Sequence, residues 1–135
     1  MDLFENLQMF NDGTMKDYTE MARVGITDDD YEIYINTNDG GKIPHFHYRK
    51  ANDWKAFHTC IMIEKPEYFH HGSKQDVLNS KQKKELVEFL KAKPKSKRYE
   101  THWDLLVEMW NLNNSDVEID ETIQMPDYQQ LPNKK

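Results

Sequence analysis

The sequence has only one cysteine, Cys60, and it lacks most of the features that reveal a cellular address. A single cysteine cannot form an intramolecular disulfide bond, so the fold has to rely on its hydrophobic core. No stretch approaches the roughly 18 consecutive apolar residues that a membrane-spanning helix needs, and the mean hydropathy is -0.96. The first residues, MDLFENLQMFNDG, lack the basic region and apolar run of a signal peptide. We therefore expect a soluble, cytoplasmic protein with no membrane contact.

The sequence also lacks the short motifs that identify many enzymes. The phosphate-binding patterns GxxxxGK(S/T) and GxGxxG do not occur, and neither does the nucleophile motif GxSxG. Metal-binding spacings of the CxxC or HExxH type are absent as well. A chain of 135 residues can bury one core, so we expect a single domain over residues 1–135 whose activity, if any, depends on less common chemistry.

Residues 30–70 have the patterns of β-strands. In DYEIYINTN, Tyr31, Ile33 and Ile35 alternate with more polar residues, as in a strand with one buried face. NDGG at residues 38–41 predicts a turn, and IPHFHYR and AFHTCIMIE follow as two further strands. EYFHHG could extend the last of them. These patterns predict an antiparallel meander of three or more strands.

Helical patterns flank the strands. TMKDYTEMAR predicts a short N-terminal helix with Thr14 as its cap, followed by an acidic loop up to residue 29. Residues 80–113 predict two amphipathic helices, SKQKKELVEFLKAK and HWDLLVEMWNLNN, the second opened by Thr101. The acidic tail, 115–135, has Met125, Tyr128 and Leu131 as candidate anchors. The expected fold class is α+β, with the meander packed by the two C-terminal helices.

The charge is segregated along the chain. The net charge of -6 combines acidic ends, residues 1–35 and 99–135, with a basic segment, residues 74–98. A basic segment could be a nucleic-acid footprint, with KAKPKSKR and Tyr99 as the best candidate patch, but the lysines are not interleaved with aromatic residues. We interpret the pattern as charge complementarity within one domain and do not expect a nucleic-acid partner.

Histidines and the single cysteine recur in the two strands after the turn. Side chains alternate between the faces of a strand, so His45 and His47 share one face, and His58 and Cys60 share one face of the next strand. The aromatic and β-branched residues between them should face the core. The three histidines and the cysteine are therefore predicted on the opposite face.

The spacing also permits a specific pairing. If the two strands form a hairpin centred on Asn52 and Asp53, His47 lies opposite His58 and His45 lies opposite Cys60, with Cβ atoms about 5 Å apart. Imidazole and thiolate are the usual ligands of zinc and related divalent transition metals. His45, His47, His58 and Cys60 are therefore candidate metal ligands.

Two interpretations of this cluster remain open. An isolated HxH pair is an unspecific signal, and we prefer a semi-exposed polar surface on which the histidines bond to carboxylates or lie beneath the C-terminal helix. The alternative is a metal-dependent hydrolase or nuclease in which His71 could add a ligand and Glu64 or Glu67 could act as general base. A Cys60 nucleophile beside His58 is a weaker alternative, because both would have to face a cleft.

The order of the features resembles a known family. NTNDGGKIPHFHYR, the following strand, a lysine-rich helix and HWDLLVEMWN resemble, over roughly residues 30 to 112, small bacterial and phage proteins known as a domain of unknown function, family 4160. The residues that carry the resemblance are Pro44, His45, Phe46, His47, Trp103, Leu106 and Trp110. The chain departs from the family in its acidic N-terminal helix, its longer segment before the lysine-rich helix and its acidic tail.

The resemblance implies a compact α+β fold and an accessory protein of a mobile element, without established catalytic residues. Together with the missing motifs, it leads to our expectation of a small cytoplasmic accessory or interaction protein that has a protein partner and is not an enzyme. The His-rich strand could bind a transition metal in such a protein.

Overall fold

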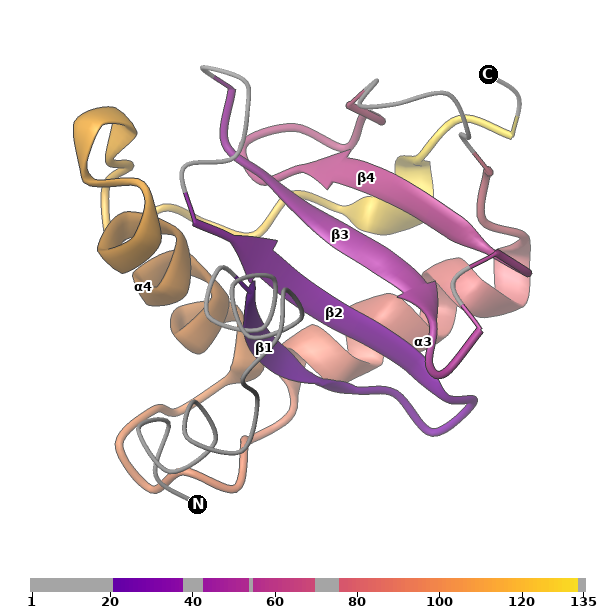
Figure 1. The fold of residues 1–135 in the computed structure, drawn as a ribbon, viewed down its shortest axis with the longest axis horizontal. Helices are drawn as coiled ribbons and strands as arrows, with labels where there is room; N and C mark the ends of the chain where they lie inside the picture. Colours follow the sequence, from indigo (N-terminus) through magenta and orange to yellow (C-terminus); the bar gives the residue numbers. More distant parts are fainter. Residues whose placement is uncertain (1–20, 38–42, 54, 70–75, 134–135) are drawn as a thin grey trace, which may run out of the picture.

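The computed structural model describes residues 21–37, 43–53, 55–69 and 76–133 of the chain. It contains four strands, β1 (Met21–Ile26), β2 (Tyr31–Asn36), β3 (His45–Lys50) and β4 (His58–Met62), which form one open antiparallel sheet in the order β1-β2-β3-β4. Two helices follow, α3 (Ser80–Lys91) and α4 (His102–Asn113), and then the short 3₁₀ helices η1 (Ser115–Val117) and η2 (Tyr128–Gln130). Figure 1 shows the sheet in front of α3, with α4 beside it. The predicted α+β class, with a meander and two helices, is confirmed.

The core lies between the helices and one face of the sheet. The aromatic and β-branched residues of β3 and of the run that contains β4 are buried there, as the alternation predicts. The apolar side of α4 packs onto the same core, as expected of an amphipathic helix. The residues concerned are Phe46, Tyr48, Thr59, Ile61, Ile63, Trp103, Leu106, Val107 and Trp110.

Both helices begin at capping residues. The side chain of Thr101 accepts a hydrogen bond from the Asp104 backbone, the predicted cap of α4. Asn79 and Gln82 form a reciprocal capping box at the start of α3, which the sequence analysis overlooked. No helix in the described ranges has the length and apolar character of a membrane span.

The acidic tail returns across the sheet and is fixed by the predicted anchors. The Tyr128 hydroxyl donates to the carbonyl oxygens of Met62 and Ile63, at 2.9 and 3.0 Å. Leu131 is buried, Met125 is partly buried, and the Lys83 ammonium donates to the Leu131 carbonyl. The tail therefore closes the core between β4 and α3.

The last three residues of the predicted N-terminal helix belong to a strand instead. Residues 14–20 lie outside the described part of the chain, but Met21–Arg23 belong to β1. The sheet therefore starts at residue 21 and not at residue 30. A short helix is marginal on its own, whereas β1 gains hydrogen bonds to β2 and places Val24 in the core.

The predicted hairpin register is also wrong. His47 pairs with Cys60, His45 with Met62 and Arg49 with His58. Asn52 adopts a left-handed φ of 66°, and the Asp53 carbonyl accepts from the Ala56 amide. The turn is therefore centred one residue later than expected, which shifts every pair by two residues and keeps the side-chain faces unchanged.

Charges from distant segments meet in ion pairs. Lys81 of α3 lies 3.5 Å from Asp29, and Arg98 lies 3.5 Å from Glu108 of α4. Both pairs join the basic segment to an acidic one, in line with internal charge complementarity. The KAKPKSKR stretch covers the end of α3 and its connection to α4, and most of it is exposed.

Candidate metal centre

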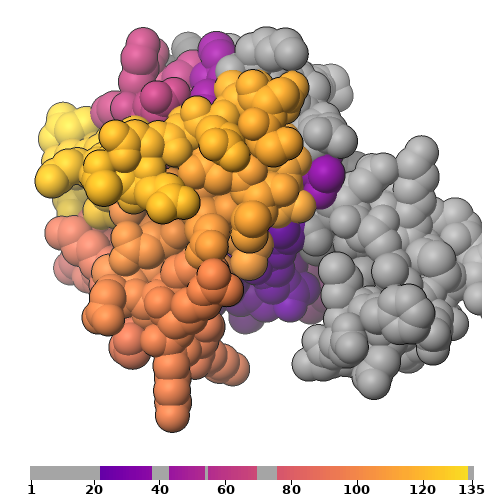
Figure 2. Space-filling view, turned by 90° about the vertical axis from the view of Figure 1, so that its left-hand side faces the viewer, coloured from indigo at the N-terminus to yellow at the C-terminus, as the bar shows by residue number. Residues whose placement is uncertain are grey.

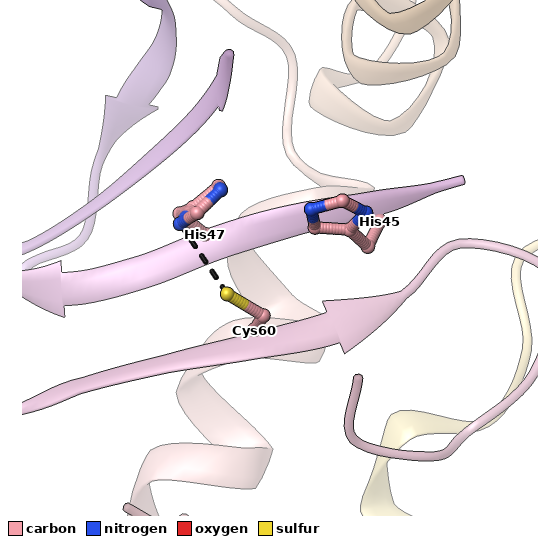
Figure 3. Close-up of side chains that lie close together, drawn as sticks. All are labelled: His45, His47 and Cys60. Atoms are coloured by element: carbon pink, nitrogen blue, oxygen red, sulfur yellow. Dashed lines mark hydrogen bonds between the residues drawn. The ribbon is translucent and has the colours of Figure 1, made fainter. Parts of the chain in front are cut away.

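Three side chains of types that can ligate a metal converge on the face of the sheet opposite the helix-packed core. His45 and His47 come from β3 and Cys60 from β4, and one ligand atom of each lies within 4.8 Å of the others. Figure 3 shows the three side chains on the same side of the two strands. Their exposures are 0, 2 and 1%. The preferred interpretation of a semi-exposed surface is therefore wrong for these residues.

His47 is at the centre of the cluster. Its Nδ1 atom lies 3.3 Å from the Cys60 sulfur and 3.1 Å from Nε2 of the half-buried His58. In a tetrahedral zinc site, bond lengths of about 2.0 and 2.3 Å separate two nitrogens by about 3.3 Å and a nitrogen from a sulfur by about 3.5 Å. The spacing around His47 is close to that of atoms sharing one ion.

His45 is oriented by the backbone. Its Nδ1 lies 2.8 Å from the carbonyl oxygen of Ile43, which can only accept, so Nδ1 carries a proton and the other ring nitrogen, Nε2, is the atom that could ligate a metal. Phe69 stacks on the ring at a centroid distance of 4.2 Å. A histidine that ligates a metal usually donates its other N–H to a carbonyl or carboxylate, and His45 has this arrangement.

Strand β2 forms one wall of the site. The Tyr34 ring stacks on His47 at 4.7 Å, and its hydroxyl lies 3.4 Å from His58 Nε2. The Asn36 amide nitrogen lies 3.4 Å from His47 Nε2, to which its N–H can donate a weak hydrogen bond. These contacts restrict the orientation of His47.

A buried carboxylate organises the same face nearby. Glu32 is 3% exposed and accepts from Arg23 at 2.6 Å and from Arg49 at 2.7 Å. The Arg49 guanidinium also lies 4.4 Å from the Tyr34 ring centroid. Because two guanidinium groups bond the buried carboxylate, the network can hold Tyr34 against His47 without leaving that carboxylate unpaired.

The sequence analysis identified the candidate ligands but not the residues that pack around them. It assigned all four candidates to one face, and their contacts confirm this. It did not connect Tyr34, Asn36 or Phe69 with the cluster. The alternation in DYEIYINTN was the available signal, since it puts Tyr34 and Asn36 on the face away from Ile33 and Ile35.

The other candidate residues are not brought to the cluster. Glu64 and Glu67, the suggested general bases, are exposed on the segment after β4. His71 lies outside the residues that the structure describes. The predicted extension after β4 does form, as a bridge between Ile61 and Tyr68, and it leads to Phe69 beside His45.

The fold and the cluster define a small α+β protein with a buried imidazole–thiol site. Comparison of the chain with protein-family models, curated proteins and solved structures finds no match. The resemblance to family 4160 therefore stays a prediction.

Proposed function

We propose that the protein binds one zinc ion through His45, His47 and Cys60. The observation that carries the proposal is that three buried donors, one of them a thiol, lie within 4.8 Å of one another. Two imidazoles and one thiolate suit zinc better than calcium or magnesium, which prefer oxygen ligands. The Nδ1–H of His45, held by the Ile43 carbonyl, adds the outer contact that metal-ligating histidines usually make.

His58 is the best candidate for a fourth ligand. Its Nε2 lies 3.1 Å from His47 Nδ1, within the spacing of two nitrogens on one zinc ion. It lies outside the set in which all ligand atoms are within 4.8 Å, so coordination by His58 requires a small rotation of its ring. With four protein ligands the site would be closed, as structural zinc sites are.

The burial of the donors supports a structural ion in a non-catalytic protein. A catalytic zinc needs a position open to water and substrate, and side chains that are at most 2% exposed enclose the ion. We propose that the ion ties β3 to β4 in a domain that serves as an accessory or interaction protein. A hydrolase or nuclease would instead need an acid at the ion, and Glu64 and Glu67 are exposed.

The test is the metal content of protein expressed without a histidine tag. After reconstitution with zinc and gel filtration, we expect about one zinc per chain in the wild type, and loss of the ion in His47→Ala and Cys60→Ser. His102→Gln is the matched control, because His102 lies on α4, away from the cluster, and bonds the Ala92 carbonyl. Circular dichroism reports whether each variant folds.

Cobalt makes the test independent of the variants. Wild-type protein loaded with Co²⁺ should show a sulfur-to-cobalt charge-transfer band in the near ultraviolet, since Cys60 would supply the sulfur. Absence of zinc after reconstitution, or cobalt binding without that band, contradicts the proposed site.

A further inference from the structure

A second candidate site lies at the opposite edge of the sheet from β4. A groove of about 750 Å³ follows the outer side of β1 and is closed by α3, the start of α4 and the segment between these helices. In Figure 2 the indigo atoms of the β1 region lie at the surface beside the orange atoms of the segment that joins α3 to α4. The groove shares no residue with the proposed metal centre.

The floor of the groove is apolar and partly aromatic. The Phe89 ring packs so closely on Gly25 that a Cβ atom there would meet it at 2.6 Å. His102 stacks on Phe89 at a centroid distance of 4.0 Å, and Val24 and Leu105 also line the groove. A side chain at position 25 would therefore force the Phe89 ring to move.

The charges in the groove are separated toward its two ends. The Asp29 amide contacts Glu85, and Gly25 contacts Phe89, so α3 runs antiparallel to β1. Asp28 and Glu85 therefore lie at one end, which we call the acidic end, and Glu88 lines the groove three residues further along α3. Lys93 and Lys95 lie at the other, where α3 ends, which we call the basic end, together with Arg23, whose guanidinium bonds Glu32.

Strand β1 forms the edge of the sheet within the described residues. A bulge between Arg23 and Gly25 interrupts its regular pairing, and bulges disfavour the addition of a further strand by backbone hydrogen bonds. A ligand would therefore be recognised by side-chain contacts with the floor and by its charges.

We propose that the groove binds an extended peptide of about five residues that carries a basic group at one end, apolar residues in the middle and an acidic group at the other. An extended chain rises about 3.3 Å per residue, so five residues span the groove-lining part of β1. The cation of the peptide pairs with Asp28 and Glu85, and its carboxylate pairs with Lys93 and Lys95. A nucleic-acid ligand is disfavoured, because the acidic end repels phosphate.

The experiment compares three fluorescein-labelled peptides by fluorescence anisotropy with the full chain. The peptides Lys-Val-Thr-Val-Glu, Glu-Val-Thr-Val-Glu and Lys-Val-Thr-Val-Lys share the apolar centre and differ only at the ends. We expect the first to bind about two- to fivefold more tightly than the others, the upper part of the range that an exposed charge pair supplies. The preference should weaken at high salt.

A charge-reversal variant gives the matched control. Lys93→Glu/Lys95→Glu changes exposed residues and should leave the fold intact, and its preference should move to the peptide with two lysines. Equal binding of all three peptides, binding of none, an unchanged preference in the variant, or tighter binding of a single-stranded oligonucleotide overturns the proposal. Zinc has no part in this test, so its outcome is independent of the metal site.

Discussion

The Nδ1 atom of His47 lies 3.3 Å from the sulfur of Cys60, directly across the β3–β4 ladder. The same nitrogen lies 3.1 Å from Nε2 of His58, which pairs with Arg49, two residues after His47 in β3. One imidazole thus contacts two donors from the facing strand. In our proposal a zinc ion replaces these contacts and joins the two strands.

Removal of the metal should lower thermal stability. A ligand present at a hundred times its dissociation constant stabilises a protein by about 2.7 kcal/mol, which corresponds to about 10 °C in the melting temperature of a domain of this size. Thermal unfolding followed by circular dichroism, with and without a chelator, measures the shift. Addition of zinc after the chelator should restore the melting temperature of the wild type and leave that of Cys60→Ser unchanged. Equal melting temperatures with and without chelator would contradict a stabilising ion.

Tyr34 should affect metal affinity through its ring. The ring stacks on His47, while its hydroxyl is 3.4 Å from His58, a weak contact. Loss of an outer contact around a metal costs about tenfold or more in affinity, so we expect that loss in Tyr34→Ala and little change in Tyr34→Phe. Competition with a chromophoric chelator measures both. Equal losses in Tyr34→Phe and Tyr34→Ala would contradict a role of the ring and assign the effect to the hydroxyl.

Replacement of two buried tyrosines by phenylalanine should change the stability of the protein differently at the two positions. Burial raises the pKa of both Tyr48 and Tyr128, so both hydroxyls stay protonated. Tyr128 donates to two carbonyl oxygens, whereas the Tyr48 hydroxyl has no hydrogen-bond partner among the described residues. Tyr128→Phe should cost about 1 kcal/mol, and Tyr48→Phe should be neutral or stabilise by up to about 1 kcal/mol. Urea unfolding measures both, and clear destabilisation in Tyr48→Phe would reveal a partner for its hydroxyl.

Glu32 should be important for stability although it is not a candidate ligand. Its buried carboxylate accepts hydrogen bonds from Arg23 and Arg49. Glu32→Gln removes the charge and should cost about 1–3 kcal/mol, less than a fully buried pair because Arg23 is half-exposed. Urea unfolding, with the exposed Glu121→Gln as control, measures the loss. A cost no larger than that of the control would contradict a structural role for this network.

The sequence predicted those features that follow from local patterns. Alternation assigned the donors of β3 and β4 to one face, and the period of the apolar residues identified α3 and α4. The register could not be predicted, because it depends on the left-handed backbone of Asn52 in the turn. The burial of His45 and the contribution of Tyr34 depend on contacts between strands, which no local pattern encodes.

The X-ray absorption spectrum of zinc-loaded protein tests the central claim most directly. Our account predicts one sulfur at about 2.3 Å together with two or three nitrogens at about 2.0 Å, from Cys60, His45 and His47, with His58 as the further nitrogen. A zinc shell that contains only nitrogen and oxygen would exclude Cys60 as a ligand and contradict the proposed site.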